Sequence, residues 1–84
     1  DPAVSGVFPN PANQSVTIIL DEVASADYNL TITNRFNLQV VNRIINTTGL
    51  KEFNISTAEL SNGVYFLTLT SNNSVITHKV IVQH

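Results

Sequence analysis

Apolar and polar residues alternate with a period of two along most of the chain, and apolar residues at helical spacing are nearly absent. Clusters of Asn, Ser, Thr and Gly separate the alternating segments and favour turns. The predicted strands lie over residues 16–20, 28–33, 38–45, 53–55, 64–69 and 75–82. The one helix candidate is a single turn at residues 56–60. Short strands at regular spacing favour an all-β fold, either an antiparallel sandwich or a barrel.

The same alternation predicts which side chains are buried. Six residues of matching phase are expected to be buried together, on sheet faces turned towards each other. They are Tyr28, Leu30, Ile32, Tyr65, Leu67 and Leu69. In the last strand, Val80 and Val82 fall on the inward face, whereas Lys79 and Ile81 fall on the outward face.

Two positions interrupt the simple pattern and predict local irregularities. Val40 and Val41 are adjacent apolar residues that break the alternation, and either a β-bulge or apolar contacts on both faces of the strand would explain the change of phase. Asn62-Gly63 precedes the most apolar strand and predicts a turn in which Gly63 adopts a positive φ or another conformation that requires glycine.

The composition limits the chain to one small domain. Its 84 residues leave no room for a second core, and residue 1 is Asp, which suggests a fragment of a longer protein. We expect residues 1–6 to be a linker remnant and residues 7–84 to be the domain. A net charge of −2 with four scattered Lys and Arg residues argues against nucleic-acid binding, and no apolar run approaches the length of a membrane-spanning helix.

Candidate catalytic and metal-binding groups are sparse. The chain has no Cys, and its Ser residues have no nearby His and acidic partners in the sequence. His78 and His84 are six residues apart on one predicted strand, too far to meet at one metal because a strand rises about 3.3 Å per residue. Asp21 and Glu22 would point to opposite faces. We therefore expect no enzyme activity, no cofactor and no metal.

Three motifs in a fixed order resemble those of a known family. They are Phe8 followed by Pro9-Asn10-Pro11, then Leu60-x-x-Gly63-x-Tyr65, and finally the strand Lys79-Val80-Ile81-Val82 that continues through Gln83 to His84. From about residue 7 to 84, the chain resembles the type A C-terminal sorting domain of proteins exported by the type IX secretion system of Bacteroidetes. The chain departs from the family pattern at Asn37, where a turn glycine is expected, although Asn tolerates the left-handed region best among other residues.

The resemblance implies a fold and a role. The fold would be an immunoglobulin-like antiparallel β-sandwich of about seven strands, and the role would be a non-catalytic label on an upstream cargo domain in the same chain. The implied partners are the outer-membrane translocon, its barrel shuttle protein and a sortase-like protease. The cargo would pass through the periplasm and outer membrane and be secreted or held at the cell surface.

Recognition of such a label requires an accessible, regular strand that a partner can contact through its backbone or through side-chain pockets. The expected partner-binding residues are those of the terminal strand: Lys79, Val80, Ile81, Val82, Gln83 and His84. Pro9, Asn10, Pro11, Leu60, Gly63 and Tyr65 are expected to act as structural motif residues. An immunoglobulin-like adhesin, a carbohydrate-binding module or a plain spacer domain would show the same strand pattern, and these alternatives stay open.

Overall fold

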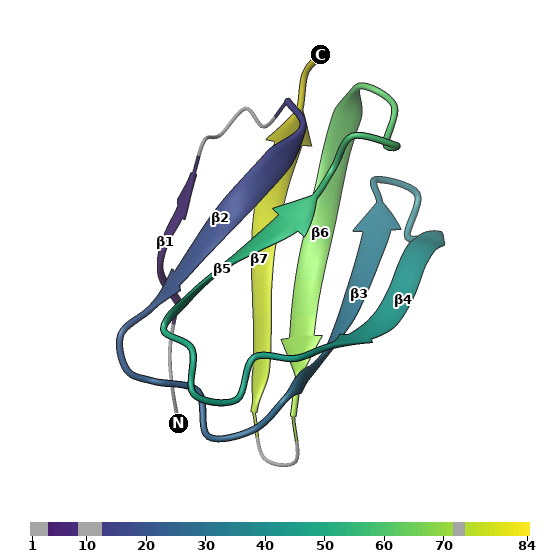
Figure 1. Ribbon diagram of the computed structural model, residues 1–84. Coiled ribbons are helices and arrows are strands. Elements are labelled where there is room, and N and C mark those ends of the chain that lie inside the picture. Colours follow the sequence, from purple (N-terminus) through teal and green to yellow (C-terminus); the bar gives the residue numbers. More distant parts are fainter. Residues whose placement is uncertain (1–3, 9–12, 72–73) are drawn as a thin grey trace.

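In a computed structural model of the protein, the structure is described for residues 4–8, 13–71 and 74–84. Seven antiparallel strands form two sheets that pack as the layers of a sandwich (Figure 1). The strands are β1 (Val4–Phe8), β2 (Ser15–Leu20), β3 (Tyr28–Asn34), β4 (Gln39–Ile45), β5 (Glu52–Ser56), β6 (Gly63–Thr70) and β7 (Val75–Val82). One sheet has the order β1-β2-β5 and the other β4-β3-β6-β7. The predicted all-β sandwich of about seven strands is confirmed.

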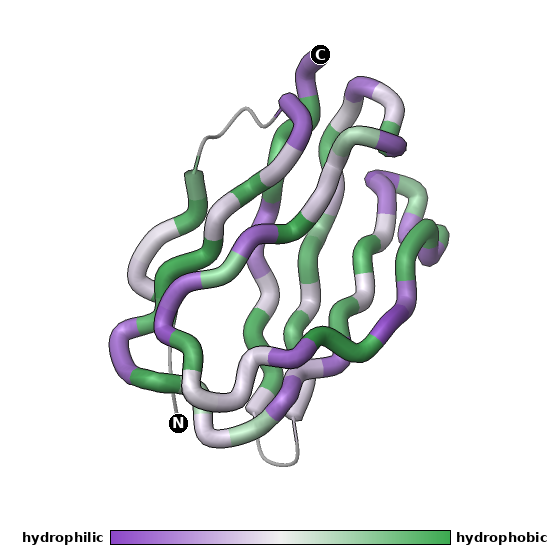
Figure 2. Tube along the Cα trace, in the orientation of Figure 1, coloured by the Kyte–Doolittle hydropathy of each residue, from purple (hydrophilic) through white to green (hydrophobic). Residues whose placement is uncertain are grey.

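The core lies between the two sheets and is built from alternate residues of each strand. Figure 2 shows the consequence along the chain, where hydrophobic and hydrophilic positions take turns on neighbouring residues. All six residues predicted to be buried together belong to this core. The three-stranded sheet contributes side chains that include Val16, Ile18 and Ile55, each at most 1% exposed.

The prediction that the six residues lie on facing sheets is wrong. Strands β3 and β6 are neighbours in one sheet, where Leu30 pairs with Leu69 and Ile32 pairs with Leu67. Their side chains therefore share one face and pack against the other sheet. The alternation of a strand fixes which side chains point inward, but it does not say which strand lies beside which.

The two predicted irregularities of the β3–β4 hairpin are present. Ile32 pairs with Val41 and Thr33 pairs with Gln39, so Val40 is the extra residue of a bulge. Asn37 stands where the family pattern has a turn glycine, and its φ of 65° lies in the left-handed region. The turn is closed by bonds from the backbone N–H of Asn37 to the carbonyl of Asn34 and from that of Asn34 to the carbonyl of Leu38.

The segment between β5 and β6 forms a turn and no helix, contrary to the weak helix candidate. The Leu60 N–H donates to the Thr57 carbonyl over 3.1 Å, which closes a single turn. The start of that turn is held to the loop before β2, because the Thr57 N–H donates to the Gln14 carbonyl and the Thr57 hydroxyl to the Asn13 carbonyl. The segment is therefore held by long-range hydrogen bonds and does not continue as a helix.

The sequence analysis predicted no strand before residue 16, but the structure has one at Val4–Phe8. β1 starts at Val4, inside the stretch 1–6 that was expected to be a linker remnant. Gly6 pairs with Ile19 of β2, and the register shifts between Val4 and Gly6. The sheet therefore includes residues that the sequence analysis placed outside the domain.

A carboxylate joins two loops where β3 begins and β4 ends. One oxygen of Asp27 accepts hydrogen bonds from the backbone N–H groups of Thr47 and Thr48, each 3.0 Å long, and from the Thr48 hydroxyl over 2.7 Å. The bonds from Thr48 hold the pKa of Asp27 below its usual value, because they stabilise the charged carboxylate. The Thr47 hydroxyl adds a bond to the Ala26 carbonyl. The β2–β3 and β4–β5 loops are thereby fastened together.

Candidate functional site

Strand β7 is an edge strand that pairs with β6 along its full length. The register runs from Val75 opposite Thr70 to Val82 opposite Gly63. Val80 and Val82 are buried, at 0% and 1% exposure, whereas Lys79 is exposed and Ile81 is 39% exposed. The predicted division of this strand into an inward and an outward face is confirmed.

The two residues after β7 are exposed, but His84 is held by three contacts. Its backbone N–H donates to the side-chain oxygen of Asn62 over 2.9 Å. Its ring Nε2 donates to the carbonyl of Leu60, and Nδ1 lies 3.0 Å from the side-chain oxygen of Asn13. No local sequence pattern predicts these contacts, because each joins residues more than 20 positions apart.

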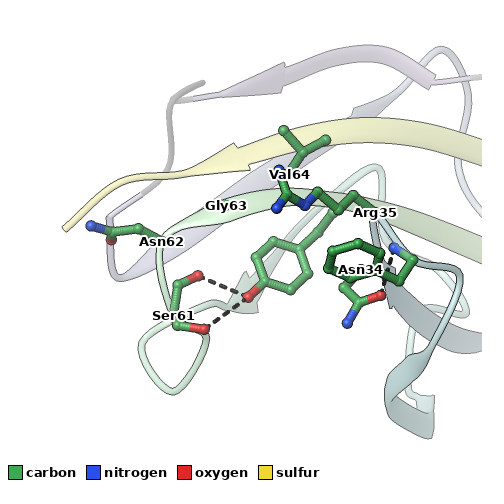
Figure 3. Close-up of a pocket in the computed structure, with 8 residues that line it drawn as sticks. Asn34, Arg35, Ser61, Asn62, Gly63 and Val64 are labelled. Atoms are coloured by element: carbon green, nitrogen blue, oxygen red, sulfur yellow. Dashed lines mark hydrogen bonds between the residues drawn. The ribbon is translucent and has the colours of Figure 1, made fainter.

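The loop that receives His84 is itself fixed by Tyr65. The Tyr65 hydroxyl donates to the carbonyl of Ser61 over 2.8 Å, and it lies 3.4 Å from the Ser61 hydroxyl (Figure 3). A tyrosine near the start of this strand that bonds back to the preceding loop is the tyrosine corner of immunoglobulin-like sandwiches. Leu60 packs against the core beside it. Leu60 and Tyr65 therefore both help to hold this loop against the sheet.

Gly63 is the first residue of β6 after this loop, and its backbone conformation requires a glycine. Its φ is 157°, which residues with a side chain rarely adopt, so the predicted positive φ is confirmed. A Cβ at this position would meet only the Tyr65 ring, at 3.9 Å, so available space is not the constraint. Pro9, Asn10 and Pro11 of the first motif lie outside the described residues.

A pocket of about 360 Å³ opens between the β3–β4 turn and the start of β6 (Figure 3). Its lining includes Arg35, Phe36, Val64 and Tyr65. The Arg35 guanidinium lies over the Phe36 ring, 4.8 Å from its centroid, in a cation–π arrangement. Sequence reasoning missed both residues, although an Arg-Phe pair in a polar turn was a visible signal of an exposed aromatic.

The described residues offer little for metal or cofactor chemistry. Within them, no three His, Asp or Glu side chains come close enough to hold a metal ion. His78 lies on the inward face of β7, half-buried, and a ring nitrogen bonds the Lys79 carbonyl at 3.0 Å. Nor does the described part of the chain contain a helix long and apolar enough to cross a membrane.

Comparison with protein families decides what kind of domain this is. A family model described as the secretion system C-terminal sorting domain matches residues 6–83. The chain belongs to this family. It is a C-terminal sorting signal for type IX secretion, a system that points to Bacteroidetes and to a secreted or cell-surface cargo. Sorting domains of this family are not known as catalysts. A comparison with curated proteins found no match.

Proposed function

We propose that the secretion machinery recognises this sorting domain through strand β7 and the two residues that follow it. One observation carries the proposal: β7 lies at the edge of its sheet and turns Lys79 and Ile81 outward while Val80 and Val82 anchor it in the core. The strand thus remains fixed while it presents a charge and an apolar side chain to a partner.

The neighbouring strand gives this edge its position. Val82 lies opposite Gly63 and Val80 opposite Tyr65, so the tyrosine corner supports the part of β6 that carries the end of β7. Gln83 and His84 stand outside the strand, and only hydrogen bonds to loops are seen for His84 among the described residues. Few core contacts would be lost if these two residues moved away from the domain, which suits a segment that a partner binds.

The proposed partners are the outer-membrane translocon and its barrel shuttle protein, which contact Lys79, Ile81, Gln83 and His84 directly. Val80 and Val82 contribute by holding the strand in place. The cargo domain lies on the N-terminal side of the sorting domain in the same chain. It is exported together with the sorting domain from the periplasm across the outer membrane. A sortase-like protease then removes the sorting domain.

Export of a cargo protein fused to this domain, in a bacterium with an intact type IX system, tests the proposal. Removal of residues 79–84 is expected to trap the cargo in the periplasm. Lys79→Ala with Ile81→Ala should block export while the circular dichroism spectrum of the domain stays unchanged. The control is Thr77→Ala, an exposed position on the same outward face. Normal export of both the truncated and the doubly substituted cargo would refute recognition through β7.

A further inference from the structure

Charged residues are divided unequally between the two halves of the sandwich. Strands β3, β4, β6 and β7 contain no Asp or Glu in their described residues, and their charged side chains are Arg43 and Lys79. Arg35 adds a third cation in the β3–β4 turn. The described acidic residues lie in β5 and in loops: Asp21, Glu22, Asp27, Glu52 and Glu59. The four-stranded sheet is therefore cationic in a chain whose net charge is −2.

The outer face of this sheet carries apolar side chains beside Lys79. Phe66 lies opposite Lys79 and Val64 lies opposite Ile81, so the four side chains form a block across β6 and β7. Phe66 and Ile81 are 37% and 39% exposed, which is high for large side chains within paired strands.

The pocket beside the β3–β4 turn continues this block. Val64 belongs to both, and Phe36, which is 69% exposed, forms the pocket lining together with Arg35. Figure 3 shows Arg35 extending from the turn towards Val64 at the start of β6. We name this continuous area the Arg35–Lys79 surface; it consists of Arg35, Phe36, Val64, Phe66, Lys79 and Ile81.

The next part of the outer face is polar, which marks the surface as a local feature. Thr31, Thr68 and Thr77 lie side by side across β3, β6 and β7, and the hydroxyls of Thr68 and Thr77 are 3.4 Å apart. The apolar and cationic side chains are thus concentrated near the end of β7, where the proposed recognition strand ends.

We propose that the Arg35–Lys79 surface binds an acidic protein segment of the secretion machinery that also carries apolar side chains. Carboxylates of the partner would pair with Arg35 and Lys79, and its apolar side chains would cover Phe66 and Ile81. Both cations are exposed, so both are available to a partner. The inference rests on the proposed recognition of β7 and extends the contact area to β6 and the β3–β4 turn.

The number of cations favours a protein over a membrane as the partner. Recognition of anionic lipid headgroups typically uses clusters of about four to eight basic residues. The Arg35–Lys79 surface has two basic residues, which lie at either end of an apolar block. This spacing fits a segment in which acidic and apolar residues are mixed. Binding to a lipid would therefore contradict the proposal.

The first test changes the part of the surface that lies outside β7. Arg35→Glu with Phe36→Ser is expected to lower the export rate of a fused cargo about tenfold, because it reverses a charge and removes an exposed aromatic at the contact. The matched control is Lys51→Glu with Leu50→Ser, an exposed cation and an adjacent apolar residue, 42% exposed, between β4 and β5. The control should export within about twofold of the unchanged domain.

The second test identifies the chemistry of the partner directly. A photo-crosslinking amino acid replaces Phe36 or, separately, Phe66 in the fused cargo, and the crosslinked peptide is sequenced after illumination of living cells. The expected product is a peptide from a component of the secretion machinery that contains Asp or Glu next to apolar residues, absent when Leu50 carries the crosslinker. A lipid adduct, a basic peptide or no product at either position would overturn the proposal.

The two proposals fail in different ways. If Lys79→Ala with Ile81→Ala blocks export but Arg35→Glu with Phe36→Ser exports normally, both variants being folded, the wider surface is refuted and recognition of β7 stands. If the truncated domain exports normally, recognition of β7 itself is refuted.

Discussion

The tyrosine corner makes a prediction that separates a hydrogen bond from the packing of an aromatic ring. Tyr65→Phe keeps the ring in the core and removes only the hydroxyl that donates to the Ser61 carbonyl over 2.8 Å. A hydrogen bond of this kind contributes about 0.5–1.5 kcal/mol to stability, and the upper half of that range is expected because the contact is partly buried. For a domain of this size, a loss of 1 kcal/mol lowers Tm by roughly 4–8 °C.

Thermal unfolding of the purified domain, followed by circular dichroism, measures this loss. The matched control is Tyr28→Phe, since Tyr28 is buried in the same sheet and no hydrogen bond of its hydroxyl is seen among the described residues. We expect Tyr65→Phe to lower Tm by several degrees and Tyr28→Phe to change it by much less. An equal effect of the two substitutions would show that the corner bond does not stabilise the fold.

Three further substitutions test the core, the glycine turn and the loop clamp. Leu67→Ala should lower the free energy of unfolding by about 2–5 kcal/mol in urea titrations, because the side chain is fully buried; a loss below 1 kcal/mol would contradict the core assignment. Gly63→Val should cost about 1–3 kcal/mol from backbone strain and lower Tm more than Gly6→Val, and the reverse order would refute the requirement for glycine. The pKa of Asp27 is lowered by its bonds to Thr48, so its contribution to stability is present above the usual carboxyl pKa of 3.8 and is lost as pH falls through the lower folded value. Between pH 6 and pH 2 the domain should lose more Tm than the Asp27→Asn variant does, and parallel curves would rule out the clamp.

The parts of the fold that depend on local chemistry were predictable from the sequence. The adjacent pair Val40 and Val41 indicated a bulge because a strand cannot keep two neighbouring side chains on one face, and the bulge is present. Asn37 was expected in the left-handed region and has a φ of 65°. The orientation of Lys79 and Ile81 followed from the period of the strand alone.

The parts that depend on which strands meet were not predictable in the same way. The placement of β3 beside β6 is set by the crossovers between sheets, so the inward phase of Leu30 and Leu67 could not show that they share a face. The closeness of Arg35 to Val64 arises only when β3 pairs with β6, and the contacts of His84 arise only when the loops that hold it have come together. No single segment of sequence carries that information.

The loop between β5 and β6 makes the position of His84 depend on the folding of the domain. Consecutive loop residues serve two purposes: the Leu60 carbonyl and the Asn62 side chain hold His84, while the Ser61 carbonyl holds Tyr65. Those acceptors reach their positions only when β6 has docked in its sheet and the loop has closed. The conformation of His84 therefore depends on completed folding of β6 and its loop, and a partly folded domain would hold His84 differently.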